Sequence, residues 1–238
     1  MKHSLSKRIG QVGVVACAAV FLAGCATSGN PKDPMEGFNR AMYSVHDGID
    51  TVLLKPAATG YDAVLPDPVQ TGVTNFFSNI GDLMISVNNL LQGKVDDAIS
   101  DFGRVAVNTT VGMFGLIDIA SDVGIPKHDE DFGQTFGRWG ADSGAYVFIP
   151  VFGPRTVRDT AGLAFDLWAD PLGQIDHVPT RNTVRGVKAV NTRANLLPAD
   201  KVIEEAAIDK YSYIRDAYLQ NRRSLVYDGN PPARSADE

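Results

Sequence analysis

The stretch DPMEGFNRAMYSVHDGIDTVLLKP, residues 33–56, has the pattern of a helix that opens a folded domain. Asp33 is predicted to be the N-cap, Pro34 suits the first helical position, and Glu36 completes a capping-box pattern. The apolar residues that follow recur at steps of three and four and form one stripe: Phe38, Met42, Val45, Ile49 and Val52. This spacing predicts an amphipathic helix that ends near Lys55-Pro56.

The segments downstream repeat this pattern. Asp67-Pro68 predicts a second helix start, and apolar stripes over residues 69–80 and 83–91 follow it before Gly93, which suits a C-cap. The best strand candidate is AYVFIPVF, residues 145–152, although a proline interrupts it. The fold class is therefore predicted to be mainly α with few or no strands, and further helices are expected over residues 95–109, 155–168, 180–195 and 199–226.

A targeting segment precedes the first predicted helix. Three basic residues lead into an uncharged run over residues 9–22, which is too short for a transmembrane helix. The box Leu22-Ala23-Gly24-Cys25 resembles a bacterial lipobox, in which the signal peptide is cut before the cysteine and the cysteine carries the lipid. An ordinary secreted protein with a chance cysteine is the alternative. We expect a signal peptide over 1–24, a lipidated tether over 25–33, one helical domain over 34–227 and a flexible tail over 228–238.

Composition limits the classes of function that remain. Removal of the signal peptide leaves 19 basic against 28 acidic residues, a net charge of −9. This charge predicts neither binding to nucleic acid nor electrostatic binding of the chain as a whole to anionic lipid. The other cysteine, Cys17, lies in the removed segment, so no internal disulfide or cysteine metal site is expected. No H-E-x-x-H, G-x-S-x-G or Walker A pattern occurs. We therefore expect no enzyme, no cofactor and no metal site, and we interpret the ionisable cluster His128-Asp129-Glu130-Asp131 as a solvated turn and helix cap rather than a weak cation site.

Two uncharged windows are unusual for a chain of this composition. They are VAVNTTVGMFGLI, residues 105–117, and SGAYVFIPVFGP, residues 143–154. Both are shorter than a spanning helix, and Gly or Pro breaks each of them. Two interpretations stay open at this point: buried core, or partial insertion into one leaflet beside the lipid anchor.

Several sequence blocks, in order, resemble the MlaA family, also called VacJ. The most extended are DPMEGFNRAMY (33–43), PDPVQTGVTNFFSN (66–79), RVAVNTTVGMFGLIDIA (104–120) and EDFGQTFGRWG (130–140). The resemblance implies a ring of amphipathic helices, partly embedded in the inner leaflet of the outer membrane, with an amphipathic channel. It implies removal of mislocalised phospholipids from the outer leaflet, transfer to an MlaC-like periplasmic carrier, and association with trimeric porins. A structural lipoprotein that scaffolds porins without moving lipid is the alternative.

Glycine spacing, the two uncharged windows and the family motifs suggest roles for individual residues. Gly140 to Gly144 is hypothesised to form a mobile turn at the channel mouth, with an immobile turn as the alternative, and Gly137 is a third gate candidate. The candidates for lipid-channel or membrane contact are Asn108, Thr109, Met113, Phe114, Tyr146 and Phe148. Family-motif residues, which either pair helices or line a path for headgroups, are Asp33, Pro34, Glu36, Phe38, Asn39, Arg40, Asn88, Gln92, Gly133, Gln134, Arg158 and Asp159.

Overall fold

The computed structural model describes residues 30–233 and confirms a mainly helical fold. The predicted signal peptide, Cys25 and the end of the predicted tail lie outside the described residues. Among residues 30–233, no helix combines the length and apolarity that crossing a bilayer requires. The elements are α2 (Glu36–Ile49), the π-helix η1 (Asp50–Leu54), α3 (Lys55–Val64), α4 (Asp67–Leu91), α5 (Val95–Thr110), α6 (Ile119–Asp122), α7 (Phe132–Arg138), β1 (Tyr146–Ile149), β2 (Gly153–Thr156), α8 (Val157–Ala169), the 3₁₀-helix η2 (Pro171–Gln174), α9 (Val178–Asn195), α10 (Leu197–Ala206) and α11 (Lys210–Val226).

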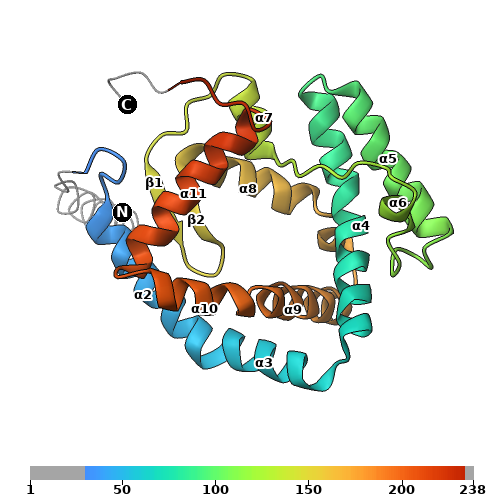
Figure 1. The fold of residues 1–238 in the computed structure, drawn as a ribbon, viewed down its shortest axis with the longest axis horizontal. Coiled ribbons are helices and arrows are strands. Elements are labelled where there is room, and N and C mark those ends of the chain that lie inside the picture. The colour runs from blue at the N-terminus through green and yellow to red at the C-terminus, as the bar shows by residue number, and fades with distance from the viewer. Residues whose placement is uncertain (1–29, 234–238) are drawn as a thin grey trace, which may run out of the picture.

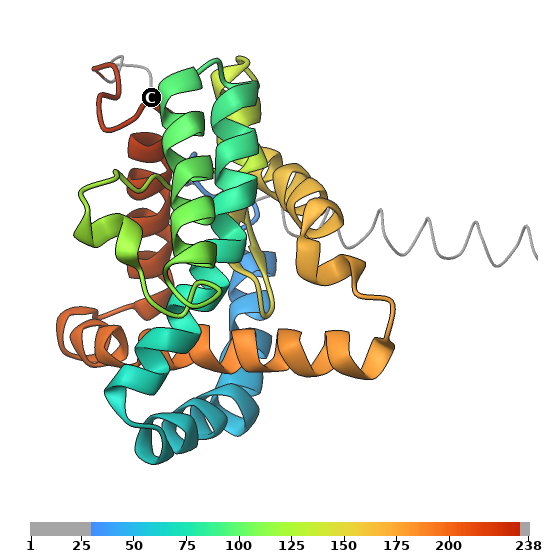
Figure 2. The same cartoon turned by 90° about the vertical axis from the view of Figure 1, so that its right-hand side faces the viewer.

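The helices follow one another around a ring-like path (Figure 1). In that view α2 and α3 form the lower left, α4 forms the right wall, α7 and α8 form the top, and α9 to α11 return along the bottom and the left. Helix α5 packs on the outer side of α4. Figure 2 shows that α4, α5 and α11 stand upright while α9 runs across them near the base. The predicted ring-shaped single domain is therefore confirmed.

Contacts between distant parts of the chain close this ring. The hydroxyl of Tyr61 on α3 donates to Asn191 on α9 at 2.9 Å, and the Asn191 amide donates to Thr74 on α4 at 3.0 Å. On the opposite side, the guanidinium of Arg40 pairs with Asp209, at the start of α11. The first joint is a chain of hydrogen bonds, whereas the second combines an ion pair with aromatic packing of Tyr43 against Tyr211.

A two-stranded antiparallel hairpin packs against α2 and α11. Tyr146 pairs with Thr156 in its register. The free edge of β1 is satisfied by one side chain, because the Asn39 amide donates to Tyr146 O at 3.0 Å and accepts from Phe148 N at 2.9 Å. Tyr146 and Phe148 form the small apolar core together with Tyr211. The strand prediction and its interruption by proline are confirmed, since β1 ends at Ile149.

Three details of the predicted N-terminal helix are corrected. Met35, not Asp33, is the N-cap, and no side chain caps this helix end. The Asp33 carboxylate is fully buried and accepts from Asn39 at 2.8 Å and from the Tyr211 hydroxyl, so it ties the entry of the chain to α11 instead. The helix also does not end at Lys55-Pro56. Residues 50–54 widen into a π-helix, in which Lys55 N bonds to the carbonyl five residues back, and α3 continues with Pro56 in its first turn.

The other helix boundaries also depend on local chemistry. The stripes over 69–80 and 83–91 belong to one helix, α4, whose C-cap is Gln92 and not the predicted Gly93. Gly93 follows directly with a φ of 80°, which glycine adopts readily at a helix end. The helices predicted over 95–109, 155–168 and 180–195 are confirmed as α5, α8 and α9. The predicted helix over 199–226 is wrong as a single element. Ala207 is extended, and the Asp209 side chain accepts from Tyr211 N at 3.1 Å and starts α11 anew.

Helices α7 and α8 approach each other so closely that only glycine fits. A Cβ on Gly162 would lie 2.3 Å from the backbone nitrogen of Gly133, and one on Gly133 would lie 2.7 Å from an Asp159 carboxylate oxygen. These distances are too short for any side chain. Gly133 therefore has a packing role in the fold, which is the structural interpretation of this motif residue.

We predict that Gly162→Ala lowers the free energy of unfolding by about 1–3 kcal/mol or more, because two backbones must separate. Gly60→Ala, in α3, is the matched control, since a Cβ there meets nothing within 4 Å. It should instead stabilise the chain by up to about 1 kcal/mol, as helical Gly→Ala changes do. Urea unfolding in detergent, followed by circular dichroism, measures both; similar effects of the two variants would contradict the close approach.

Candidate functional site

The distribution of polar and apolar side chains is inverted relative to an ordinary soluble domain. Among the described residues, buried polar and charged residues outnumber buried apolar ones, and many large apolar side chains are exposed. Soluble proteins bury charged residues only rarely, and extended exposed apolar surface marks contact with a membrane or a partner. The candidate functional site is therefore a surface rather than a catalytic cleft.

Helix α5 shows this inversion most clearly. Its apolar stripe faces outward, with Val95, Ile99 and Phe102 between 51% and 66% exposed. Its opposite face is polar and buried, with Asp101 and Arg104 at most 1% exposed. The polar face meets α4, because Asp101 accepts from Asn89 at 2.8 Å and Arg104 lies 3.4 Å from Asp82. Figure 1 shows α5 on the outer side of α4.

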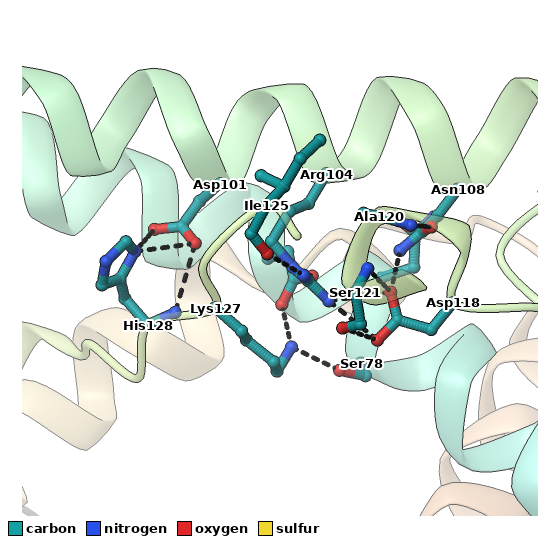
Figure 3. A network of polar contacts seen from close by, with 12 residues as sticks. Ser78, Asp101, Arg104, Asn108, Asp118, Ala120, Ser121, Ile125, Lys127 and His128 are labelled. Carbon is teal, nitrogen blue, oxygen red and sulfur yellow. Dashed lines mark hydrogen bonds and ion pairs between the residues drawn. The ribbon is translucent and has the colours of Figure 1, made fainter. Parts of the chain in front are cut away.

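A network of charges holds the buried face of α5 (Figure 3). The Arg104 guanidinium forms two hydrogen bonds to Asp118 at 2.8 and 2.9 Å, donates to Ile125 O at 2.8 Å, and lies 3.4 Å from an Asp82 oxygen. Lys127 contacts the same Asp82 carboxylate from the more exposed side. The segment that follows α5 is thereby folded back onto the α4–α5 pair.

The same network determines the protonation of Asp118. Burial alone would raise the pKa of this carboxyl, but hydrogen bonds from Ser121, Asn108 and Arg104 outweigh burial and lower the pKa to about 2. Asp118 therefore remains ionised throughout the physiological range. Its contribution to stability is present above about pH 4 and is lost only as the pH falls toward 2.

The loop over residues 111–117, which we call the apolar loop, extends the exposed face of α5. Met113 and Phe114 both adopt the left-handed conformation, with φ of 54° and 60°. Such backbone is unfavourable for bulky residues and costs about 1–3 kcal/mol each. Phe114 is nevertheless 78% exposed. The other exposed apolar side chains of the loop are Val111, Met113, Leu116 and Ile117.

Hydrogen bonds and close contacts hold the apolar loop in this conformation. Gly115 N donates to Asn108 O at 2.8 Å, and Ile117 N donates to Gly112 O at 2.9 Å. A Cβ on Gly115 would lie 2.7 Å from the Asn79 amide, which donates to Thr109 at 3.0 Å. A strained, well-bonded loop that presents apolar side chains is typical of a surface that another apolar phase covers.

The structure separates the candidate contact residues into two groups. Met113, Phe114 and Thr109 lie at the exposed end of α5 and in the apolar loop. Asn108 is buried, donates to Asp118 at 2.9 Å and accepts from Ala120 N, so its role is structural. Tyr146 and Phe148 are at most 2% exposed and belong to the core, which corrects the expectation that they contact membrane.

The two apolar windows thus have different outcomes. The window 105–117 ends in the exposed apolar loop. The window 143–154 supplies core residues through β1, and its exposed large apolar side chains, Val151 and Phe152, lie at the tip of the hairpin. The buried residues of the second window follow from its strand structure, because every second side chain of β1, Tyr146 and Phe148, faces α2 and α11.

The family-motif residues lie mostly at joints between elements. Asn88 on α4 accepts from Thr135 at 2.7 Å, and Gln92 donates to Glu130 at 2.6 Å. Gln134 is buried and donates to Asp129 O at 2.9 Å. Other motif residues at such joints are Asp33, Glu36, Asn39, Arg40, Gly133, Arg158 and Asp159, whereas Phe38 is partly exposed and Pro34 lies just before α2. The structural interpretation of these residues therefore accounts for their positions.

Asp159 is the most densely bonded of them. It is buried, accepts from Thr156 at 2.8 Å and from the Tyr218 hydroxyl at 2.6 Å, and pairs with Arg158 and Arg222. Burial alone would raise the pKa of Asp159, but the nearby Arg222 charge and these hydrogen bonds lower it overall. The cluster joins β2, α8 and α11 into one unit.

The gate candidates also differ from one another. Gly137 lies inside α7, and a Cβ there would come within 2.9 Å of both Arg158 and Val226, so close packing explains this glycine. Gly140 and Gly144 have φ of 93° and 65°, which only glycine adopts readily. These angles explain the residue type at both positions. Mobility of the 140–144 turn stays a prediction.

The cluster at 128–131 is divided between two roles. The Asp131 side chain accepts from Gln134 N at 2.8 Å and caps α7, which confirms the helix-cap part of the interpretation. The solvated part is wrong for Glu130, which is buried and pairs with Lys94 at 2.8 Å. The His128 ring lies 3.1 Å from Asp101 on the buried face of α5. Within residues 30–233, no three His, Cys, Asp or Glu side chains are grouped as metal ligands.

Sequence reasoning missed a second exposed apolar surface, on α7 and α8. Phe136, Trp139 and Phe165 form a chain of ring contacts with centroid separations of 5.4 and 5.9 Å, and Trp139 is largely exposed. Trp168, one turn further along α8, is 76% exposed. The signal in the sequence was the aromatic spacing within FGQTFGRW and AFDLW, which α7 and α8 place side by side.

Comparisons with known proteins agree on one family. The family described as "MlaA lipoprotein" matches residues 31–225. The "Intermembrane phospholipid transport system lipoprotein MlaA" of Escherichia coli K12 is 31% identical and covers 96% of each chain, and that of Haemophilus influenzae is 32% identical over 89% of this chain and 88% of its own. A solved structure described as "Structural basis for maintenance of bacterial outer membrane lipid asymmetry" aligns with a TM-score of 0.70 at 31% identity, covering 83% of this chain and 99% of that one.

We predict that Arg104→Gln lowers the free energy of unfolding by about 3–5 kcal/mol, because buried Asp82 loses a cationic partner and Asp118 loses two hydrogen bonds. Arg40→Gln is the matched control. Its ion pair with Asp209 is 41% and 43% exposed, so at most about 1 kcal/mol is expected. Thermal unfolding in detergent at neutral pH compares the two variants; an equal, small effect would contradict the importance of the buried network.

Proposed function

This chain belongs to the MlaA lipoprotein family, and from that premise we propose that it transports phospholipid between membranes. In detail, it removes phospholipids mislocalised to the outer leaflet of the outer membrane and passes them to a periplasmic carrier. Curated relatives named as intermembrane phospholipid transport lipoproteins support the general activity. The direction of transport, the MlaC-like carrier and the trimeric porins as partners rest on the family resemblance.

The observation that carries this proposal is the inverted α5 with its apolar loop. Each large apolar side chain that leaves water for an acyl phase contributes about 1.5–3 kcal/mol. The apolar loop alone offers Val111, Met113, Phe114, Leu116 and Ile117. An apolar surface of this size favours insertion into one leaflet. The charged face of α5 would stay hydrogen-bonded within the protein.

The lipid anchor and the apolar loop would act together. One acyl chain alone binds a membrane only marginally, so stable attachment needs several chains or a second contact. Lipidation at Cys25 supplies chains, and the helical domain begins only a short tether away. We propose that this attachment holds the domain at the periplasmic face of the outer membrane, partly embedded in the inner leaflet.

The proposed activity requires no covalent chemistry. A phospholipid moves when an amphipathic path offers its acyl chains and its headgroup a continuous environment, which lowers the barrier to crossing. Exposed apolar faces beside polar joints fit that requirement. The alternative, a lipoprotein that only scaffolds porins, would use the same apolar surface for protein contact and would move no lipid.

We predict that deletion of the gene raises the phospholipid content of the outer leaflet, and that a plasmid copy restores it. Restoration should fail with Cys25→Ala, because the unlipidated chain is not held at the membrane. Labelling of outer-leaflet phospholipid in intact cells measures this. A deletion strain with an unchanged leaflet, from which porin complexes are nevertheless lost, would favour the scaffold instead.

We predict that Phe114→Asp, introduced into the Cys25→Ala chain, weakens retention on vesicles and leaves the fold intact. Phe114 is exposed in a loop, so the charge costs nothing in water but opposes entry into a leaflet. Phe148→Asp is the contrasting variant: the side chain is buried in the core, so this chain should unfold. Vesicle flotation together with circular dichroism separates the effects. Undiminished retention of Phe114→Asp would contradict insertion of the loop.

A further inference from the structure

Helix α9 has an unusual charge for this chain. Its segment VPTRNTVRGVKAVNTRAN carries Arg181, Arg185, Lys188 and Arg193 and contains no Asp or Glu. The whole chain, by contrast, has a net charge of −6. Positive charge is therefore concentrated on one element of an acidic protein.

Three of these cations lie on one flank of the helix. Arg181, Arg185 and Lys188 are spaced by four and three residues, which places them in one row about 10 Å long. The face that packs against α3 and α4 is different and contains buried Asn191 and Ala194. The row, which we call the basic stripe, lies beside that interface: Arg185 is exposed, whereas Arg181 and Lys188 are half-buried.

The basic stripe has no acidic partner among residues 30–233. None of its three residues forms an ion pair there, whereas Arg193 on the same helix pairs with Asp50 at 2.7 Å and with Asp200 at 2.6 Å. Like charges at this spacing repel, and Arg181 also lies near the helix N-terminus, where a cation is disfavoured. The arrangement therefore weakens the isolated helix, and an anion bound along the stripe would remove that repulsion.

Two of the cations turn toward η2. Arg181 Nη1 donates to Ile175 O at 3.4 Å, and an Arg185 nitrogen lies only 2.7 Å from the position that a Cβ of Gly173 would take. η2 and the short segment after it connect α8 to α9. Figure 2 shows α9 running below α8. Exposed apolar side chains lie close by in sequence on both elements, namely Trp168 on α8 and Val178 and Val187 on α9.

We infer that the basic stripe binds the headgroup of an anionic phospholipid, and thereby favours anionic over zwitterionic lipids. This inference rests on the proposed function and names the substrate class. Cations beside exposed aromatic and aliphatic side chains are typical of surfaces that contact headgroups and acyl chains together. An acidic protein is a weaker candidate, because a protein interface spans about 800 Å² on each side and would also meet the acidic surface of the rest of this chain.

The test measures lipid selectivity of the purified, lipidated protein in detergent. The protein is equilibrated with equal amounts of phosphatidylglycerol and phosphatidylcholine, repurified, and its bound lipids are quantified by mass spectrometry. We expect the unmutated protein to enrich phosphatidylglycerol at least about tenfold, since each cation near an anionic lipid favours binding several-fold. The variant R181Q/R185Q/K188Q should lose this enrichment and keep its helical circular dichroism.

Two further variants make the test specific. K32Q/R138Q/K201Q removes the same total charge from positions that also form no ion pair within residues 30–233, and it should keep the enrichment. R181K/R185K preserves charge and should keep most of it. Equal losses in both glutamine variants would show only a general charge effect and would overturn the inference.

The remaining outcomes separate this inference from the proposed function. Unmutated protein that retains lipid without preferring phosphatidylglycerol overturns the inference and leaves transport standing. Unmutated protein that retains no phospholipid at all contradicts the proposed function itself. A stripe that instead docks an acidic protein would leave lipid enrichment unchanged in R181Q/R185Q/K188Q, and that result would also overturn the inference.

Discussion

The buried guanidinium of Arg104 is the constraint on which the α4–α5 half of the molecule depends. A cation with almost no exposure costs free energy unless its N–H groups are paired, and its partners come from α4 and from two points beyond α5. The chain after α5 must therefore return to the helix pair. The apolar loop lies within that return, so its side chains are presented outward by the same bonds that stabilise the interior.

Buried polar side chains also join the other elements. Asn39 completes the edge of the hairpin, Asn191 joins α9 to two helices, and Asp159 gathers contacts from β2, α8 and α11. Polar joints of this kind would suit the membrane-bound location that we propose for this chain. Apolar attraction between helices weakens when acyl chains are as apolar as the side chains, whereas close packing and hydrogen bonds persist. Joints in which polar groups bond to one another do not depend on water outside them.

Local patterns predicted the helices well, because apolar spacing and caps act within a few residues. The limits of α4, α5 and α9 and the positive φ of Gly93 after α4 followed from such signals. Features set by distant contacts could not be predicted. The stripe Val95–Ile99–Phe102 has the spacing of a core-facing helix, and only the partners of Asp101 and Arg104 reveal that the opposite face is buried. Tyr146 and Phe148 likewise look like lipid contacts until α2 and α11 cover them. The basic stripe of α9 was present in the sequence, yet its lack of acidic partners depends on which carboxylates the fold brings near.

The outward stripe of α5 has a practical consequence for handling this protein. Val95, Ile99 and Phe102 make none of the buried polar contacts. The polar residues that hold α5 in the fold are therefore on a different face from the apolar residues that are exposed. Polar replacements along that stripe would alter solubility and leave the bonded interior as it is. A detergent-free form for crystallisation or solution NMR can therefore be designed from the surface alone, starting with one helix.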